Sequence, residues 1–260
     1  RQHKVVLFLP NPSDNIMASS NEAKWEVLYW PSTVGRGEMV KLIFEDQGVP
    51  YTLPIEEDDD KAWTKSPALV QFLQNQDGKL PYVLAPPILR RGDFIIFQAP
   101  AILRYLGKEL GLLPDSPEDQ VYADSLMETV TDLIAEGHDA WHPIEKIKGH
   151  AEQKKEAEAH FIPLYKEKRL PKFAAFFEKV LERANKGKDS VYLFGEKFTY
   201  VDIGLFHVFH GIRFQCPDEY KSLDIPRIRA FVEAVEKRPN IAAYLASERR
   251  FAYSNTGPTF

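Results

Sequence analysis

The segment from Trp25 to Met39 combines three features that can act together on a negative charge. Strand-like residues, WEVLYW, end in Tyr29 and Trp30, a short loop follows, and Arg36 stands where a helix is expected to begin. A phenol hydroxyl is a hydrogen-bond donor on a rigid stem. A neighbouring arginine and a helix N-terminus both favour an anion. The sequence thus raises the question of why a strand should end on Tyr29 where the chain turns towards a helix.

Two histidine pairs give weaker signals. His138 and His142 lie four residues apart on an expected helix, a spacing that can bring two imidazoles to one metal ion. Because no third ligand is evident nearby, we expect no metal site and interpret this pair as an ordinary polar helix face. His207 and His210 lie in the apolar segment IGLFHVFHGI and are interpreted as histidines of the core or of a cleft.

Other catalytic motifs are missing from the sequence. GRG at 35–37 lacks the glycine spacing of a dinucleotide-binding fingerprint, and neither a phosphate loop nor a serine nucleophile elbow occurs. The single cysteine, Cys216, excludes an intramolecular disulfide and suits a reducing compartment, so we expect a cytoplasmic protein. Its position directly before a proline favours a structural role.

The tripeptide Lys79-Leu80-Pro81 stands at the start of an expected strand. A proline in that position allows a cis peptide bond. With such a bond, the N–H and C=O groups of Leu80 would face outward and could pair with a peptide-like ligand. An ordinary proline at the start of a strand is the alternative.

Length and composition favour a globular protein with a substantial core. The chain has 260 residues, of which 44% are apolar and 12% aromatic, and its formal net charge is −5. Basic and acidic residues are interleaved, so we expect neither a nucleic-acid footprint nor a membrane-surface patch. The apolar runs are shorter than the ~20 residues of a membrane span. We expect residues 1–24 to be a flexible extension.

The pattern of apolar residues predicts two differently built parts. Residues 25–110 predict the order strand, helix, strand, helix, strand, strand, helix, with strands at 25–30, 50–55, 80–89 and 93–97. The first strand–helix–strand unit implies parallel pairing and the last two strands an antiparallel hairpin. After a linker at 111–117, helices are predicted at 118–148, 152–185, 199–213, 226–236 and 239–248, followed by a tail at 251–260. The fold class is therefore α/β plus all-α.

One helix start has a specific signature. Thr199 and Asp202 match a capping box, in which the first side chain caps the helix and the second reaches back. Phe198 and Ile203 could add a hydrophobic staple. We interpret this motif as a folding device without chemistry of its own.

Seven motifs, taken in their order and spacing, resemble the cytosolic glutathione S-transferases, particularly the tyrosine-type alpha, mu, pi and sigma classes. They are VLYW, GRGE, FEDQGVPY, GKLPYVL, FQAPAILRYLG, FTYVDIGLF and RPNIAAYLAS, spread between residue 25 and about residue 250. The resemblance implies a thioredoxin-like domain at 25–110 and an all-helical domain at 118–250. It also implies glutathione as a co-substrate, a small-molecule electrophile, a homodimer and a role in detoxification.

The resemblance assigns roles to individual residues. Tyr29 would hold the glutathione sulfur with its hydroxyl, and Arg36 would support it. The implied glutathione-binding residues are Trp63, Lys65 and Lys79 at the glycyl end, Leu80 and Pro81 at the cysteinyl backbone, Gln98 and Ala99 at the γ-glutamyl group, and Asp124 from the other subunit. Alanine at position 99 departs from the family, which usually has serine there. The loop from Tyr29 to Arg36 and the hairpin from Pro81 to Gln98 are also longer than usual.

The implied chemistry is activation of a thiol. A free thiol with a pKa of ~8.5 is only a few per cent thiolate at neutral pH, and lowering that pKa by ~2 units needs ~2.7 kcal/mol of differential stabilisation. The electrophile would lie in an apolar pocket between Tyr29 and the helical domain. Candidates for its lining are Trp30, Trp141, His142 and His207, with core packing as the alternative for each.

Two functions remain open from the sequence. The first is an enzyme that adds glutathione to an electrophile, or uses it in a related isomerase or peroxidase reaction. The second is a non-catalytic protein of the same fold that serves as a binding or scaffold protein, a reading supported by Ala99 and the altered loops. Glutathione binding without turnover would favour the second.

Overall fold

The computed structural model describes residues 24–31, 33–54, 67–74, 81–146, 148–254 and 259–260. Its first part holds one mixed sheet with the strand order β2-β1-β3-β4. The strands are β1 (Trp25–Leu28), β2 (Tyr51–Thr52), β3 (Ile88–Arg91) and β4 (Phe94–Phe97). β1 runs parallel to β2 and antiparallel to β3, and β3 and β4 form an antiparallel hairpin. These pairings confirm the two predicted from the sequence.

The strand predicted at 80–89 begins later than expected. β3 starts at Ile88, and the peptide bond between Pro86 and Pro87, directly before it, is cis. Pro81 belongs to the preceding loop, so the expectation that it opens the strand was wrong. The physical reason is that prolines at 81, 86 and 87 cannot donate the N–H groups that a strand ladder needs.

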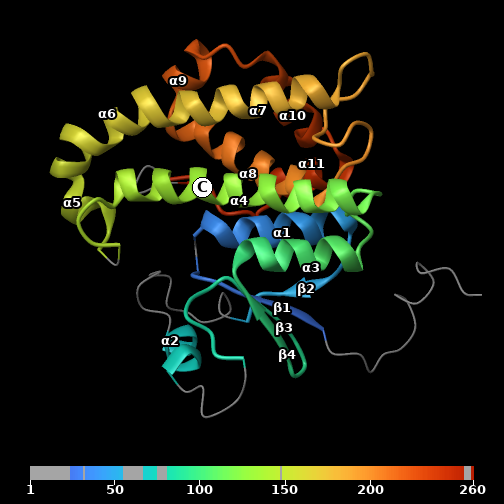
Figure 1. Cartoon of the computed structure of the whole chain (residues 1–260). Coiled ribbons are helices and arrows are strands. Elements are labelled where there is room, and N and C mark those ends of the chain that lie inside the picture. The colour runs from blue at the N-terminus through green and yellow to red at the C-terminus, as the bar shows by residue number, and fades with distance from the viewer. Residues whose placement is uncertain (1–23, 32, 55–66, 75–80, 147, 255–258) are drawn as a thin grey trace, which may run out of the picture.

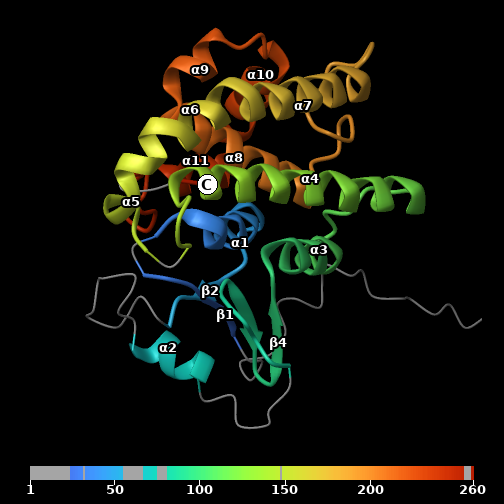
Figure 2. The ribbon, with the colours of Figure 1, turned by 60° about the vertical axis from the view of Figure 1, so that its left-hand side comes forward.

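The sheet separates two groups of helices (Figures 1 and 2). α1 (Gly35–Gln47) and α3 (Ala99–Glu109) cover the face towards the helical part, and α2 (Pro67–Gln74) lies on the opposite side. Alternation along β1 produces this division, because Val27 belongs to the main core while the next residue, Leu28, packs in a small cluster with Leu69 of α2.

The second part of the chain is helical. It contains α4 (Pro117–Trp141), α5 (His150–Glu156), α6 (Ile162–Leu164), α7 (Leu170–Ala184), α8 (Tyr200–Gln215), α9 (Pro217–Ser222), α10 (Pro226–Glu236) and α11 (Pro239–Leu245). The helix predicted at 152–185 is interrupted by two π-helical turns, η3 (Ala157–Phe161) and η4 (Tyr165–Arg169). The sequence also missed α9 and placed the end of α4 too late. A mixed sheet followed by helices confirms the predicted fold class.

α8 is the central helix of this part, and its start is as predicted. The Asp202 carboxylate accepts the backbone N–H of Thr199 at 2.7 Å and that of Leu193 at 2.9 Å. Burial nevertheless raises the pKa of Asp202 to about 6, although these hydrogen bonds act in the opposite direction. Of the described helices, none has the length and apolar character needed to cross a bilayer.

Charged pairs join α1 to the C-terminal helices. Asp46, near the end of α1, forms two hydrogen bonds with Arg238, at 2.6 and 2.9 Å. Near its start, the buried Glu38 receives hydrogen bonds from Tyr244 at 3.0 Å and Arg250 at 3.1 Å. These contacts hold both ends of α1 against the C-terminal part of the chain.

Candidate active site

Tyr29 follows β1 directly and lies over the first turn of α1. Its hydroxyl oxygen accepts a hydrogen bond from the backbone N–H of Arg36, with an N–O distance of 3.0 Å. Two glycines leave room for the phenol. A Cβ atom added at Gly35 would lie 2.5 Å from the hydroxyl oxygen, and one added at Gly37 would lie 2.4 Å from Cγ of the ring. The GRG motif therefore provides the space that Tyr29 occupies.

The Tyr29 hydroxyl is a neutral hydrogen-bond donor. The side chain is 8% exposed, and burial raises the pKa of the phenol, an effect that the charge and backbone N–H of Arg36 oppose only in part. The phenol therefore stays protonated at neutral pH. Because its oxygen accepts from Arg36, the hydroxyl hydrogen remains for a second bond, and no residue in the described ranges accepts it.

The surroundings of this hydroxyl favour negative charge. Arg36 is partly exposed at the N-terminus of α1, where the helix dipole is positive. No carboxylate in the described segments forms an ion pair with the Arg36 guanidinium. The acidic residue of the same turn, Glu38, is buried and paired with Arg250, so its charge is already countered. An anion placed beside Tyr29 would meet a hydroxyl donor, a guanidinium and a helix N-terminus.

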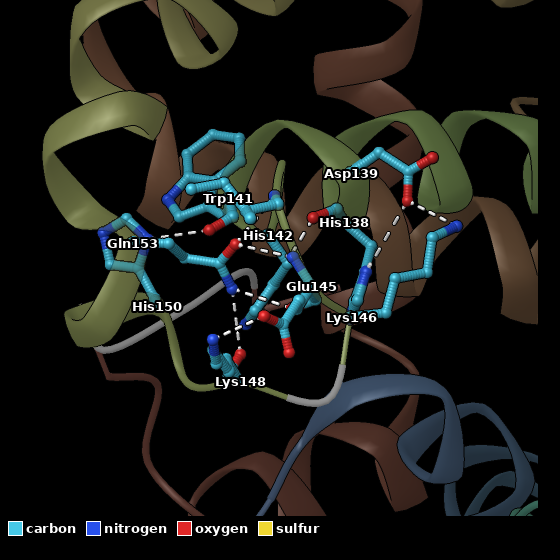
Figure 3. Close-up of polar contacts among 10 residues, drawn as sticks. His138, Asp139, Trp141, His142, Glu145, Lys146, Lys148, His150 and Gln153 are labelled. Carbon is cyan, nitrogen blue, oxygen red and sulfur yellow. Dashed lines mark hydrogen bonds and ion pairs between the residues drawn. The ribbon is translucent and has the colours of Figure 1, made fainter.

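Across from this turn lies the C-terminal end of α4, with a polar cluster (Figure 3). The rings of His138 and His142 are stacked, with centroids 4.4 Å apart and planes at 17°. Burial lowers the pKa of His138 most, and the charges of His142 and Arg36 lower it further, to about 4. The charge of Arg36 thus acts on the end of α4.

Gln153 fixes the loop that follows His142. Its buried amide accepts the backbone N–H groups of Ile144 at 2.9 Å and Glu145 at 3.2 Å, and donates to the carbonyl oxygens of Glu145 at 2.9 Å and Lys148 at 3.0 Å. Figure 3 shows this amide at the centre of the loop. The hydrogen-bonding capacity of the amide is therefore spent on holding the end of α4 and its loop in one conformation.

Gln98 and Ala99 lie at the N-terminus of α3. Gln98 is exposed and has a φ of 72°, and among the described residues it alone combines a positive φ with a side chain. A non-glycine residue held in that region is strained, and such residues concentrate at ligand sites. Ala99 is buried and is the first residue of α3, so its backbone N–H is one of the donors that have no partner within the helix.

Several predicted glutathione-binding residues cannot be placed. Trp63, Lys65, Lys79 and Leu80 lie outside the described residues. Pro81 is described and exposed, in the loop before β3.

The Asp124 carboxylate is engaged within its own chain. It pairs with Arg104 of α3 at 2.7 Å and accepts a hydrogen bond from the Tyr200 hydroxyl of α8. These contacts tie α4 to its two neighbouring helices. The expected contact of Asp124 with glutathione bound to the other subunit stays a prediction.

Of the four predicted pocket residues, Trp141 and His207 are buried in the interior and Trp30 is partly buried. Trp30 packs against the cluster beside α2, on the sheet face away from the helical part. Trp141 is 3% exposed and lies edge-on against the rings of Tyr165 and Phe260. His207 is 1% exposed, burial lowers its pKa to about 3, and neither ring nitrogen has a hydrogen-bond partner among the described residues. For Trp30, Trp141 and His207 the structure thus corresponds to the core-packing alternative. His142 is half-buried at the C-terminal end of α4.

The sequence missed three residues of this site. Two of them, Gly35 and Gly37, flank Arg36 in the GRG motif. Their position a few residues after Tyr29 was the signal that could have indicated a close approach of its ring. His138 was considered only as a metal ligand, and its proximity to Arg36 could not be seen from the sequence. No cluster of three histidine, cysteine or acidic residues able to hold a metal occurs within the described part of the chain. Burial raises the pKa of the Cys216 thiol to about 12, so this thiol is not reactive.

Comparisons with known proteins agree with this architecture. A model of the glutathione S-transferase C-terminal domain matches residues 138–248. A glutathione S-transferase of Plasmodium falciparum is 28% identical over 229 residues, which cover 87% of this chain and 98% of the relative. Glutathione S-transferase P 1 of Xenopus laevis is 28% identical over 220 residues, covering 83% and 89% of the two chains.

A solved structure shows the same fold. The pi-class glutathione S-transferase of Onchocerca volvulus superposes with a TM-score of 0.65 at 23% identity, covering 85% of this chain and 92% of the other. The mixed sheet followed by helices is therefore the thioredoxin-like plus helical fold of these proteins. In sequence, the chain is thus similar to glutathione S-transferases over most of its length, and in its helical part to their C-terminal domain.

Proposed function

We propose that this chain is a glutathione transferase that activates the glutathione thiol as a thiolate and adds it to a small, largely apolar electrophile. One observation carries the proposal. The Tyr29 hydroxyl accepts the Arg36 N–H at 3.0 Å, stays protonated, and keeps its own hydrogen for another acceptor. A thiolate sulfur is such an acceptor, and the positive end of α1 favours its charge.

The three units of glutathione fit along this edge of the domain. The γ-glutamyl group would lie at the start of α3, where Gln98 and the backbone of Ala99 are available. The cysteinyl backbone would pair with Leu80 and Pro81, as the family resemblance implies. The glycyl end would be held by Trp63, Lys65 and Lys79, as the family resemblance implies.

The remaining parts of the proposal follow the family. The protein would act as a homodimer in the cytoplasm, in detoxification, with Asp124 near the γ-glutamyl group of the partner subunit. Arg104 and Tyr200 already bind this carboxylate. Asp124 would therefore have to bind the partner's glutathione while it keeps these two contacts. Loss of glutathione affinity in Asp124→Asn, with the dimer preserved in gel filtration, would support it.

The test is an ultraviolet titration of the thiolate of glutathione bound to the full chain, together with the initial rate of conjugation. The transferase predicts that the bound thiol titrates about 2 units below the free value of ~8.5. Binding with an unshifted thiol pKa and no turnover would instead support the non-catalytic binding protein, for which Ala99 in place of serine is the structural reason.

A further inference from the structure

The first turn of α1 contains a buried carboxylate beside the groups that favour an anion. Glu38 is the acidic residue of this turn and is 1% exposed. Two residues earlier, the backbone N–H of Arg36 donates to the Tyr29 hydroxyl at 3.0 Å. A negative charge on Glu38 would therefore oppose the thiolate that the proposed function places beside Tyr29.

Arg250 supplies the opposite charge. Its Nε donates to Oε1 of Glu38 at 3.1 Å, while the Tyr244 hydroxyl of α11 donates to Oε2 at 3.0 Å. The Arg250 guanidinium also lies 4.5 Å from the centre of the Tyr253 ring, which adds a cation–π contact. Because the side chains of Arg250 and Glu38 are 11% and 1% exposed, salt in the solvent screens this pair only weakly.

Burial leaves the phenols and imidazoles around this pair neutral at pH 7. It raises the pKa values of the phenols and lowers those of the imidazoles. These groups are Tyr51, Tyr244, Tyr253, His207 and His210. Burial also raises the pKa of Glu38, and the charges of Arg250 and Lys41 oppose that rise. The carboxylate thus owes its ionised form in the interior to these two cations.

We propose that Arg250 is a positioning residue for the thiolate, which acts by cancelling the charge of Glu38 in the turn that receives the sulfur. The inference rests on the proposed function, because it needs a thiolate beside Tyr29. It also gives the chain beyond α11 an influence on the reactivity of the thiol, since Arg250 lies in that segment.

The effect is one of charge over a distance. Glu38 and Arg36 are two residues apart and therefore lie about 200° apart around the axis of α1. The carboxylate and the sulfur would then be separated by roughly 10 Å, the diameter of a helix. At an effective dielectric constant of about 20, one uncompensated charge at that distance changes a pKa by roughly 1 unit.

The experiment titrates, by ultraviolet absorption, the thiol of glutathione bound to the full chain and to its variants. Arg250→Met removes the positive charge, Glu38→Gln removes the negative charge, and the double variant removes both. Arg250→Lys keeps the positive charge. The matched control is Arg249→Met, because this neighbouring arginine is 61% exposed and pairs with Glu45, near the other end of α1.

The two single changes should have effects of opposite sign. The thiol pKa should rise by about 1 unit in Arg250→Met, where Lys41 and Tyr244 still hold the Glu38 carboxylate, and fall by about 1 unit in Glu38→Gln. The double variant, Arg250→Lys and Arg249→Met should stay near the wild-type value.

A merely structural role of the pair predicts a different pattern. Loss of either partner would then loosen the first turn of α1 and raise the thiol pKa, in Glu38→Gln as well. A rise in Glu38→Gln, an unchanged thiol pKa in Arg250→Met, or a double variant that differs from the wild type as much as Arg250→Met does would overturn the proposal. The sign of the change in Glu38→Gln decides between the two roles even if Arg250→Met does not fold.

The same titration separates this inference from the proposed function. If the wild type lowers the pKa of the bound thiol but the changes at Arg250 and Glu38 leave that pKa unaltered, the role of Arg250 is refuted and the transferase stands. If the wild type does not lower the thiol pKa at all, the proposed function fails, and the inference fails with it.

Discussion

Gly37→Ala tests whether the space around Tyr29 sets the reactivity of the thiol. The new Cβ atom would lie 2.4 Å from Cγ of the Tyr29 ring, so the ring must move. Alanine gains about 1 kcal/mol of helix propensity over glycine, while overpacking costs about 1–3 kcal/mol, so the free energy of unfolding should fall by at most about 2 kcal/mol. The protein should therefore remain folded.

The effect on glutathione should be much larger than the effect on folding. A hydrogen bond to a charged group contributes about 1.5–3 kcal/mol, and 1 pKa unit corresponds to about 1.4 kcal/mol, so the pKa of the bound thiol should rise by about 1–2 units. The assay is an ultraviolet titration of bound glutathione. Gly107→Ala is the matched control, because its Cβ would meet another tyrosine ring, that of Tyr200, at 3.0 Å. A thiol pKa unchanged in Gly37→Ala, or raised equally in the control, would refute the reasoning.

Three further changes test the fold that supports the site. Arg238→Ala leaves the buried Asp46 carboxylate unpaired and should lower the free energy of unfolding by about 3 kcal/mol in urea titrations; a change below 1 kcal/mol would contradict this. Asp202 binds its proton more tightly in the folded state, with a pKa of about 6 against 3.8, so its ionisation should cost stability on the order of 3 kcal/mol as pH rises from 4 to 7. That decline should be missing in Asp202→Asn, and an equal decline in both proteins would argue against it. Gly137→Ala would bring a Cβ atom to 2.3 Å from the Phe260 ring and should lower the melting temperature, whereas adding Phe260→Ala should cost less than the sum of the two single changes; strict additivity would exclude this contact.

Local signals in the sequence predicted local structure well. The capping box at Thr199 and Asp202 depends on residues three apart, and the structure contains it. The pairing of the strands followed from their order and from short turns. The start of β3 was wrong because the apolar residues at 80–89 look like a strand, while prolines within that stretch prevent one.

Contacts between distant segments were beyond the sequence. Glu38 and Lys41 look like surface residues of α1, yet both are buried. Arg250 and Tyr244, more than two hundred residues away in the chain, supply the partners of Glu38. Likewise, the hydrogen bond from Tyr200 to Asp124 depends on how α8 packs on α4.

The central claim is that the Tyr29 hydroxyl stabilises the glutathione thiolate. The most direct test is to titrate the thiol of glutathione bound to the wild type and to Tyr29→Phe, with Tyr105→Phe, a tyrosine that packs on Trp25 and Phe94, as the control. The account predicts a lowered thiol pKa in the wild type and the control, and a rise of about 1–2 units in Tyr29→Phe alone. A thiol pKa that is the same in Tyr29→Phe as in the wild type would contradict the account.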